Sequence, residues 1–137
     1  MANAIYLMYN GTCEEAINFY KEVLGGNVTQ MQRYGEVPGS SSDTYKDKIM
    51  HAVMEAGNLT LMFSDSGEKT NVEFGNNFSI VIDCKSDGEL KRTFDALSTG
   101  GTVTMPLQDT FWGATFGMCT DKYSVNWMLN YDKPKTS

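Results

Sequence analysis

The sequence predicts an α+β protein made of two consecutive βαβββ modules. Three observations predict this fold class: the chain repeats itself, each copy contains one capped helix, and β-rich runs flank each helix in the same order. The repeat appears when each residue is compared with the one 75 positions later. The matches fall at equivalent places in both copies, which indicates the architecture before any element is assigned. They pair Glu14 with Glu89, Phe19 with Phe94, Gly25 with Gly100, Gly26 with Gly101, Val28 with Val103 and Thr29 with Thr104.

The first copy begins with a β-rich run at residues 4–9. Thr12 and Glu15 have the spacing of a capping box, which predicts the start of a helix. Apolar residues follow at helical spacing, and Gly25 ends the helix because glycine accepts the left-handed conformation of a C-terminal cap. Three more strands are expected at about 27–34, 48–56 and 58–64. Residues 35–43 are rich in turn formers and predict a mobile excursion between two of these strands.

The second copy repeats this order. A β-rich run at residues 78–83 precedes a helix that Ser86 and Glu89 cap and Gly100 ends. Strands are then expected at about 102–108, 114–119 and 124–131. A polar segment at about 65–75 predicts a linker between the copies. We therefore expect a single domain over residues 1–137, made of modules at about 1–66 and 76–132.

Composition and charge exclude several classes of partner. The chain is 41% hydrophobic and 20% charged, as globular proteins are, and no apolar run approaches the roughly 20 residues that cross a bilayer. Seventeen acidic and eleven basic residues give a net charge of −6, which repels nucleic acid. Cys13, Cys84 and Cys119 form neither a disulfide framework nor a Cys-x-x-Cys motif, and the first residues lack a secretory pattern. We expect a cytoplasmic protein that binds neither membranes nor nucleic acid.

Four segments make the chain similar to a known family. They are residues 11–26 (GTCEEAINFYKEVLGG), 48–52 (KIMHA), 103–113 (VTMPLQDTFWG) and 116–127 (FGMCTDKYSVNW). With the repeat, they resemble the PhnB-like branch of the glyoxalase / bleomycin resistance / extradiol dioxygenase (vicinal oxygen chelate) superfamily. The resemblance implies a curved, partly open mixed sheet barrel with helices outside, a cavity within, and a homodimer. The branch has been labelled 3-demethylubiquinone 3-methyltransferase-like, but no strand leads into a Gly-rich loop that opens a helix, as a nucleotide-like cofactor requires.

The resemblance also implies positions for a metal, one on the first and one on the last strand of each module. It places them at Ile5, Met62, Asn77 or Ser79, and Met128. Isoleucine offers no ligand, and a thioether is a weak ligand for divalent iron, nickel, manganese or zinc. We therefore expect no metal and no cofactor at these positions. Met62 and Met128 are interpreted as cavity wall or core.

His51 is the one histidine of the chain and lies in a predicted strand. Facing the cavity, it would be a general base or a hydrogen-bonding group for a ligand. The alternative is a hydrogen-bonded structural histidine. Residues on either side of it are apolar, so the pattern leaves both interpretations open.

Two further groups of residues are candidates for the cavity. Gln108, Phe111 and Trp112 belong to one turn whose composition suits the rim of a ligand pocket, or a hairpin with Trp112 packed on the core. In the first strand, Ile5, Leu7 and Tyr9 share one side, so all three line the cavity if Ile5 does, and Tyr6 and Met8 then face the helix. The alternative for Tyr9 is an ordinary core position.

These residues support three hypotheses about function. The first is a metal-free protein that binds a small, partly aromatic or apolar molecule in the barrel cavity. The second is an enzyme of the superfamily (of lyase, isomerase, transferase or dioxygenase type) that uses His51 or a metal site other than the inherited one. The third is a structural or interaction module that dimerises through exposed sheet edges. The sequence does not name a substrate.

Overall fold

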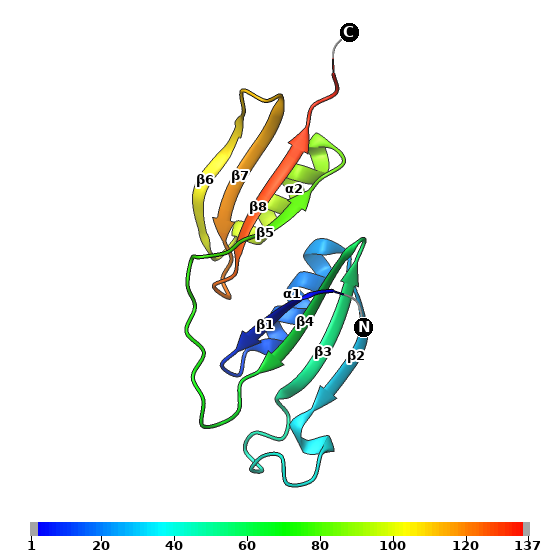
Figure 1. Cartoon of the computed structure of the whole chain (residues 1–137), viewed down its shortest axis with the longest axis vertical. Helices are drawn as coiled ribbons and strands as arrows, with labels where there is room; N and C mark the ends of the chain where they lie inside the picture. Colours follow the sequence, from blue (N-terminus) through cyan, green and yellow to red (C-terminus); the bar gives the residue numbers. More distant parts are fainter. Residues whose placement is uncertain (1–2, 136–137) are drawn as a thin grey trace. The chain divides into compact units, whose positions relative to one another are not determined.

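The computed structural model describes residues 3–135. The chain divides into two compact units, and the boundary between them falls between Glu73 and Phe74. In the first unit, the elements are β1 (Ile5–Tyr9), α1 (Cys13–Leu24), β2 (Asn27–Arg33), the short 3₁₀ helix η1 (Tyr34–Glu36), β3 (Ile49–Ala56) and β4 (Leu59–Asp65). The strands form one sheet in the order β1-β4-β3-β2 (Figure 1). The pair β1–β4 is parallel, and the other two pairs are antiparallel.

The second unit repeats this topology. Its elements are β5 (Ile80–Asp83), α2 (Asp87–Ser98), β6 (Thr102–Asp109), β7 (Ala114–Thr120) and β8 (Asn126–Asp132), and the sheet order is β5-β8-β7-β6. Each four-stranded sheet is open, and neither closes on itself as a barrel. The predicted α+β class and the two βαβββ modules are confirmed. The expectation that both modules form one domain stays a prediction.

Helix α1 lacks the predicted capping box. Thr12 makes no side-chain capping hydrogen bond. Instead, the Asp65 carboxylate at the end of β4 accepts from the backbone N–H of Gly11 at 2.9 Å and of Cys13 at 3.0 Å. A negative charge is favourable there because of the helix dipole. At the other end, Gly25 has a φ of 67° and caps the helix as predicted.

Helix α2 has a capping box close to the predicted one. The Ser86 hydroxyl accepts from the backbone N–H of Glu89 at 3.0 Å. The Glu89 carboxylate accepts from the backbone N–H of Lys85 at 2.8 Å, one residue further back than a standard box. The helix ends at Ser98, followed by Gly100 with a φ of 78°.

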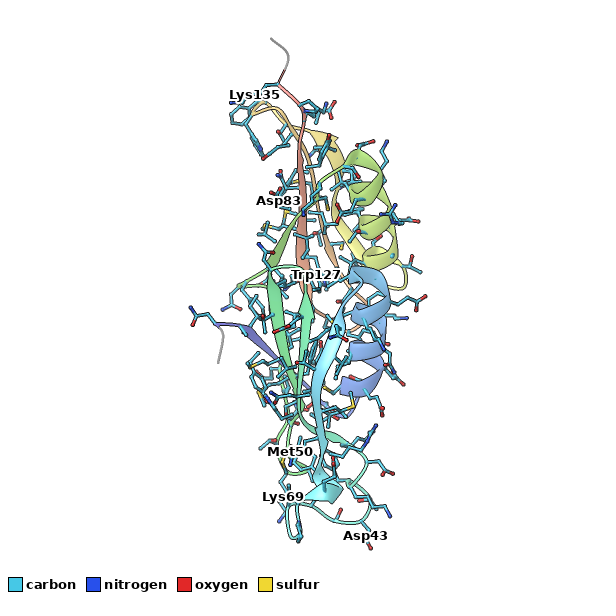
Figure 2. The ribbon with its side chains drawn as sticks, turned by 90° about the vertical axis from the view of Figure 1, so that its right-hand side faces the viewer. Asp43, Met50, Lys69, Asp83, Trp127 and Lys135 are labelled. Carbon is cyan, nitrogen blue, oxygen red and sulfur yellow. The ribbon has the colours of Figure 1, made fainter. Side chains whose placement is uncertain are left out.

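Each helix covers one face of the sheet of its own unit (Figure 2). The core lies between helix and sheet, where large side chains are fully buried. In the first unit these include Tyr9, Ile17, Tyr20, Met54, Leu61 and Phe63, and in the second Leu90, Leu97, Trp127 and Leu129. The opposite face of each sheet is left without a helix of its own unit, so each sheet has a covered and an open face.

The excursion between β2 and β3 is anchored to the segment that follows β4. The hydroxyls of Tyr34 and Tyr45 donate to backbone carbonyls of residues 65 and 66. The backbone N–H and the hydroxyl of Ser42 donate to Glu68, each at 2.6 Å. The mobility expected for residues 35–43 stays a prediction, but these contacts attach both ends of the segment. Within residues 3–135, no helix is long and apolar enough to cross a membrane.

Candidate functional site

The two faces of β1 are the reverse of the predicted ones. Tyr9 is fully buried, and its hydroxyl donates to the hydroxyl of Tyr20 on α1 at 3.3 Å. Leu7 is 4% exposed on the same side, and Ile5 shares this side because side chains alternate along a strand. Leu7 and Tyr9 are therefore core residues, and Ile5 is half-buried on the same side, so the assignment of these three residues to the cavity is wrong.

Tyr6 and Met8 were expected to face the helix, and they lie on the open face instead. Both are 46% exposed. Register in the sheet places Tyr6 beside Met62, and Met62 beside Val53. Neighbours across a sheet point to the same side, so these three residues form one row on the open face.

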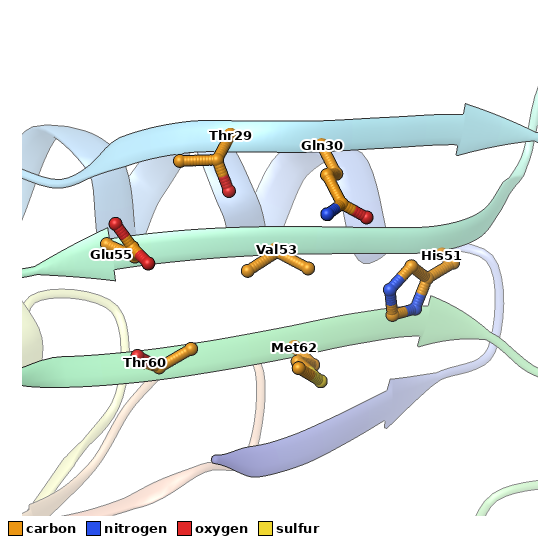
Figure 3. Close-up of a pocket in the computed structure, with 7 residues that line it drawn as sticks. All are labelled: Thr29, Gln30, His51, Val53, Glu55, Thr60 and Met62. Carbon is orange, nitrogen blue, oxygen red and sulfur yellow. The ribbon is translucent and has the colours of Figure 1, made fainter. Parts of the chain in front are cut away.

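A groove of about 390 Å³ lies on this open face. Its volume is in the range of small-molecule sites. Figure 3 shows its residues projecting from β2, β3 and β4 on one side of the sheet. Val53 and Met62 are almost fully buried and form an apolar floor, with polar groups around them. The lining residues are Thr29, Gln30, His51, Val53, Glu55, Thr60 and Met62.

His51 lies at one end of this groove and contacts Tyr6 on β1. Its Nδ1 atom is 3.0 Å from the hydroxyl of Tyr6. The two rings are stacked with centroids 5.7 Å apart. Partial burial raises the pKa of the Tyr6 phenol, and the nearby Ser64 side chain offsets part of this rise, so the phenol stays protonated at neutral pH.

The charge of the groove favours some ligands over others. Within the described part of the chain, Glu55 is the one acidic residue that lines it, and no lysine or arginine does. Gln30, Thr29 and Thr60 add hydrogen-bonding groups that carry no charge. Such a site favours a neutral or cationic molecule over an anion.

The inherited metal positions carry no suitable set of ligands. Register pairs Tyr6 with Met62 and Val81 with Met128 on the open faces of the two sheets. Tyr6 rather than Ile5 is thus the partner of Met62. Two thioethers, a phenol and a valine do not fit divalent iron, nickel, manganese or zinc. Among residues 3–135, no three His, Cys, Asp or Glu side chains gather in a way that could hold a metal ion.

Asn77 and Ser79 are also displaced from the predicted position. Strand β5 begins at Ile80, so both residues precede it. Asn77 is exposed and Ser79 is half-buried. Val81, which is 58% exposed, occupies the place opposite Met128 that we expected for one of them.

The open face of the second sheet carries the other predicted residues. Met128 is paired with Met118 on β7, and Gln108 is paired with Phe116. At the turn between β6 and β7, Phe111 is 97% and Trp112 is 58% exposed, so Trp112 does not pack on the core. The rings of Phe111 and Trp112 meet edge to face, with centroids 5.0 Å apart. A ligand-binding role for these residues stays a prediction.

Cys13 is unsuited to be a nucleophile. The first turn of a helix can lower the pKa of a thiol, but the Cys13 thiol is fully buried. Burial, together with the negative charge of Asp65, raises the pKa of the Cys13 thiol well above its usual range. A thiol that stays protonated is unreactive.

Two of the groove residues, His51 and Met62, are predicted from the sequence. Tyr6 beside the groove is not, and neither are the other five lining residues, Thr29, Gln30, Val53, Glu55 and Thr60. Strand parity was the available signal, because His51, Val53 and Glu55 alternate along one strand. Strand parity does not tell which side of the sheet is open, and a contact with a residue of another element is needed to decide it.

Comparisons with known proteins identify the family. A family profile described as 3-demethylubiquinone-9 3-methyltransferase matches residues 1–130. Protein YjdN of Escherichia coli (strain K12) is 33% identical over 138 residues, which cover 93% of this chain and 93% of YjdN. The crystal structure of protein PA1353 from Pseudomonas aeruginosa is 41% identical with a TM-score of 0.88, covering 98% of this chain and 99% of that chain.

A second solved structure, the PhnB protein from Bacillus cereus, is 27% identical with a TM-score of 0.82, covering 96% of this chain and 99% of that chain. A glyoxylase/bleomycin resistance protein/dioxygenase domain from Frankia sp. EAN1pec shares the fold at 12% identity and a TM-score of 0.71, covering 99% of this chain and 94% of that domain. The chain belongs to the family described as 3-demethylubiquinone-9 3-methyltransferase, is similar to a PhnB protein, and shares its fold with a glyoxylase/bleomycin resistance domain.

Proposed function

We propose that this protein binds a small, partly aromatic or apolar molecule in the groove of its first sheet, without the superfamily metal. The composition of the groove is the main support for this proposal. It combines an apolar floor with a few polar groups, which is the usual composition of a small-molecule site. Methionine suits such a floor because its flexible thioether adapts to rings of different shape.

The position of Tyr6 supports a ligand with a ring. Its side chain is 46% exposed beside Met62, and its ring already stacks on His51. Aromatic rings favour offset or edge contacts with other rings. The ligand is neutral or cationic, since Glu55 lines the groove and no basic residue of the described chain does.

Ligand-induced stabilisation tests this proposal. Free ligand at ten times its Kd stabilises the native state by about 1.4 kcal/mol, which raises Tm by about 3–5 °C for a domain of this size. Chelator-treated protein is titrated with p-cresol and followed by thermal unfolding. We expect Gln30→Trp, whose indole lies across the groove, to lose this response.

Met31→Trp is the matched control. Met31 is on the same strand but pairs with the buried Ala52 of the covered face. We expect this variant to respond to p-cresol as the wild type does. A wild type that p-cresol and related phenols leave unchanged contradicts the proposal, as does a Gln30→Trp variant that responds fully.

A metal-free enzyme is the second candidate, and the half-buried His51 imidazole that lines the groove favours it. A histidine buried away from the groove would have excluded it, but His51 lines the groove and is positioned by Tyr6. A general base needs this kind of access to a substrate proton. Mass spectrometry of a metabolite extract incubated with wild type or with His51→Gln separates the two candidates. An enzyme depletes a compound that the variant leaves intact, whereas a binding protein depletes none.

Our proposal of function does not include the methyl transfer that the family description names. The connections between strand and helix, residues 10–12 and 84–86, contain one glycine, Gly11. A nucleotide-like methyl donor needs a Gly-rich loop at such a place. We therefore propose no methyl transfer.

We also propose that the protein is a cytoplasmic homodimer. Cys13, Cys84 and Cys119 are free and buried, which suits a reducing compartment. The exposed rings of Phe111 and Trp112 are of the kind that anchors protein interfaces. Light scattering of the wild type and of Phe111→Ser tests the dimer. A monomeric wild type contradicts it.

A further inference from the structure

The groove of the first sheet has different chemistry at its two ends. Register pairs Glu55 with Thr60 across β3 and β4, and Val53 with Met62. Figure 3 shows Glu55 and Thr60 at one end of the groove and His51 at the other. Val53 and Met62 lie between these ends and are almost fully buried. The groove therefore has an acidic end, an apolar middle and an imidazole end.

The carboxylate at the acidic end is available to a ligand. Glu55 is exposed, and within residues 3–135 its side chain makes no ion pair and no hydrogen bond. Glu14 on α1 differs in this respect, because it is paired with Arg33 at 2.6 Å. In the described part of the chain, no lysine or arginine lines the groove to compete for Glu55. A cation that enters the groove therefore meets one uncompensated negative charge.

The spacing along β3 sets the shape of the molecule that fits. Side chains on one side of a strand recur every two residues, which is roughly 7 Å. Glu55 lies one such step from Val53, and His51 lies one step away in the other direction. A ring that rests on Val53 and Met62 can thus reach the Glu55 carboxylate through a short carbon chain. An ammonium group at the end of that chain donates charge-assisted hydrogen bonds to the carboxylate.

We infer that the ligand is an aromatic amine, with its ring on Val53 and Met62 and its ammonium group at Glu55. This inference rests on the proposed function, and it adds the class of ligand and its orientation. The far side of the ring then faces His51, whose imidazole can hydrogen-bond a hydroxyl there. The net charge of −6 attracts cations to the whole molecule, but Glu55 decides which end of the groove holds the amine.

Three phenols that differ only in the group opposite the hydroxyl test the inference. p-Cresol carries a methyl group, tyramine an aminoethyl group and p-hydroxyphenylacetate a carboxymethyl group. Their Kd values for chelator-treated protein are measured by isothermal titration calorimetry at low ionic strength, where charges are little screened. We expect tyramine to bind about fivefold more tightly than p-cresol, which is the upper range for an exposed ion pair. p-Hydroxyphenylacetate should bind more weakly than p-cresol.

A pair of charge variants separates Glu55 from the charge of the whole molecule. Glu55→Gln keeps the shape of the side chain and removes its charge, so tyramine should lose its advantage while p-cresol binds as before. Glu22→Gln is the matched control, because Glu22 is exposed on α1, which covers the opposite face of the sheet. It changes the net charge by the same amount and should keep the preference for tyramine. Backbone amide spectra show whether each variant is folded.

NMR of the tyramine complex tests the orientation of the ligand. We expect nuclear Overhauser effects from the ring protons to the methyl groups of Val53 and Met62. The methylene protons next to the nitrogen should show them to the methyl group of Thr60, which register places beside Glu55. Contacts of these methylene protons with the His51 ring instead would mean a reversed ligand and would overturn the inference.

The binding results distinguish this inference from the proposed function. A wild type that binds tyramine no more tightly than p-cresol overturns the inference, and so does a folded Glu55→Gln variant that keeps the preference. A Glu22→Gln variant that loses the preference equally also overturns it, because the effect then comes from net charge. In all three cases, binding of p-cresol still supports the proposed function. A protein that binds none of the three phenols overturns both.

Discussion

Replacing Asp65 by asparagine tests how the first unit is held together. This carboxylate is 1% exposed and accepts three backbone hydrogen bonds. One oxygen accepts from Gly11 at 2.9 Å and Cys13 at 3.0 Å, and the other accepts from Ile49 at 2.9 Å. It therefore connects the start of α1, the end of β4 and the start of β3. An asparagine has the same shape but only one oxygen.

The expected loss of stability follows from these three hydrogen bonds. In Asp65→Asn, the amide oxygen can keep the bonds to Gly11 and Cys13, but the NH₂ group then faces the N–H of Ile49. One charge-assisted bond, worth about 1.5–3 kcal/mol, is lost, and a buried N–H without a partner adds about 1–3 kcal/mol. We expect a loss of about 3–5 kcal/mol in the free energy of unfolding. This is a large share of the roughly 5–15 kcal/mol of an ordinary domain.

Urea unfolding followed by far-ultraviolet circular dichroism measures this loss as a lower midpoint at an unchanged slope. Asp43→Asn is the matched control, because Asp43 is exposed and the same change there should cost less than about 0.5 kcal/mol. If Asp65→Asn lowers the free energy of unfolding by less than about 1 kcal/mol, the carboxylate does not hold α1, β3 and β4 together.

Three more predictions concern the backbone, the thiols and the metal. Gly101→Ala should lower the free energy of unfolding by about 3 kcal/mol, because the new Cβ would lie 2.1 Å from the carbonyl oxygen of Thr120. Gly88→Ala is the control and should be neutral or stabilising, because its new Cβ meets nothing within 4 Å. Urea unfolding measures both changes. Burial raises the pKa of Cys84 and Cys119 to about 11 from an ordinary 9.0. The unfolded state then loses its thiol protons first, so stability should fall between about pH 9 and pH 11, and less so in a variant with both cysteines changed to alanine. Elemental analysis of purified protein should find less than stoichiometric metal, and a full equivalent bound by nitrogen or oxygen ligands would contradict our interpretation of the open faces.

The repeat in the sequence was sufficient to predict the order and approximate bounds of every strand and both main helices. Local signals explain this success. Gly25 ends α1 and Ser86 caps α2 through contacts with residues close in sequence. The cap of α1 was missed for the opposite reason, because it comes from Asp65, 52 residues after Cys13.

The orientation of β1 could not be predicted from its own residues. Both of its sides carry large side chains, with Leu7 and Tyr9 on one side and Tyr6 and Met8 on the other. Strand alternation separates these two sets but does not say which one meets the helix. The bond between Tyr9 and Tyr20 decides this, and it depends on tertiary packing.

The candidate site was only partly predictable for a similar reason. His51 stood out because of its chemistry, and Met62 because of the resemblance to the superfamily. The groove between them depends on the register of β2, β3 and β4, which places Gln30 beside Val53 and Val53 beside Met62. The bond from His51 to Tyr6 joins residues 45 positions apart, and nothing local in the sequence indicates it.

The most direct test of metal-free binding on the open face is an NMR measurement of contacts between p-cresol and the protein after treatment with a chelator. Val53 and Met62 form the floor of the groove and carry methyl groups that report on a bound ring. We predict nuclear Overhauser effects from the p-cresol methyl protons to the methyl groups of Val53 and Met62. Contacts confined to other parts of the chain, or binding that appears only after a divalent metal is added, would contradict the proposal.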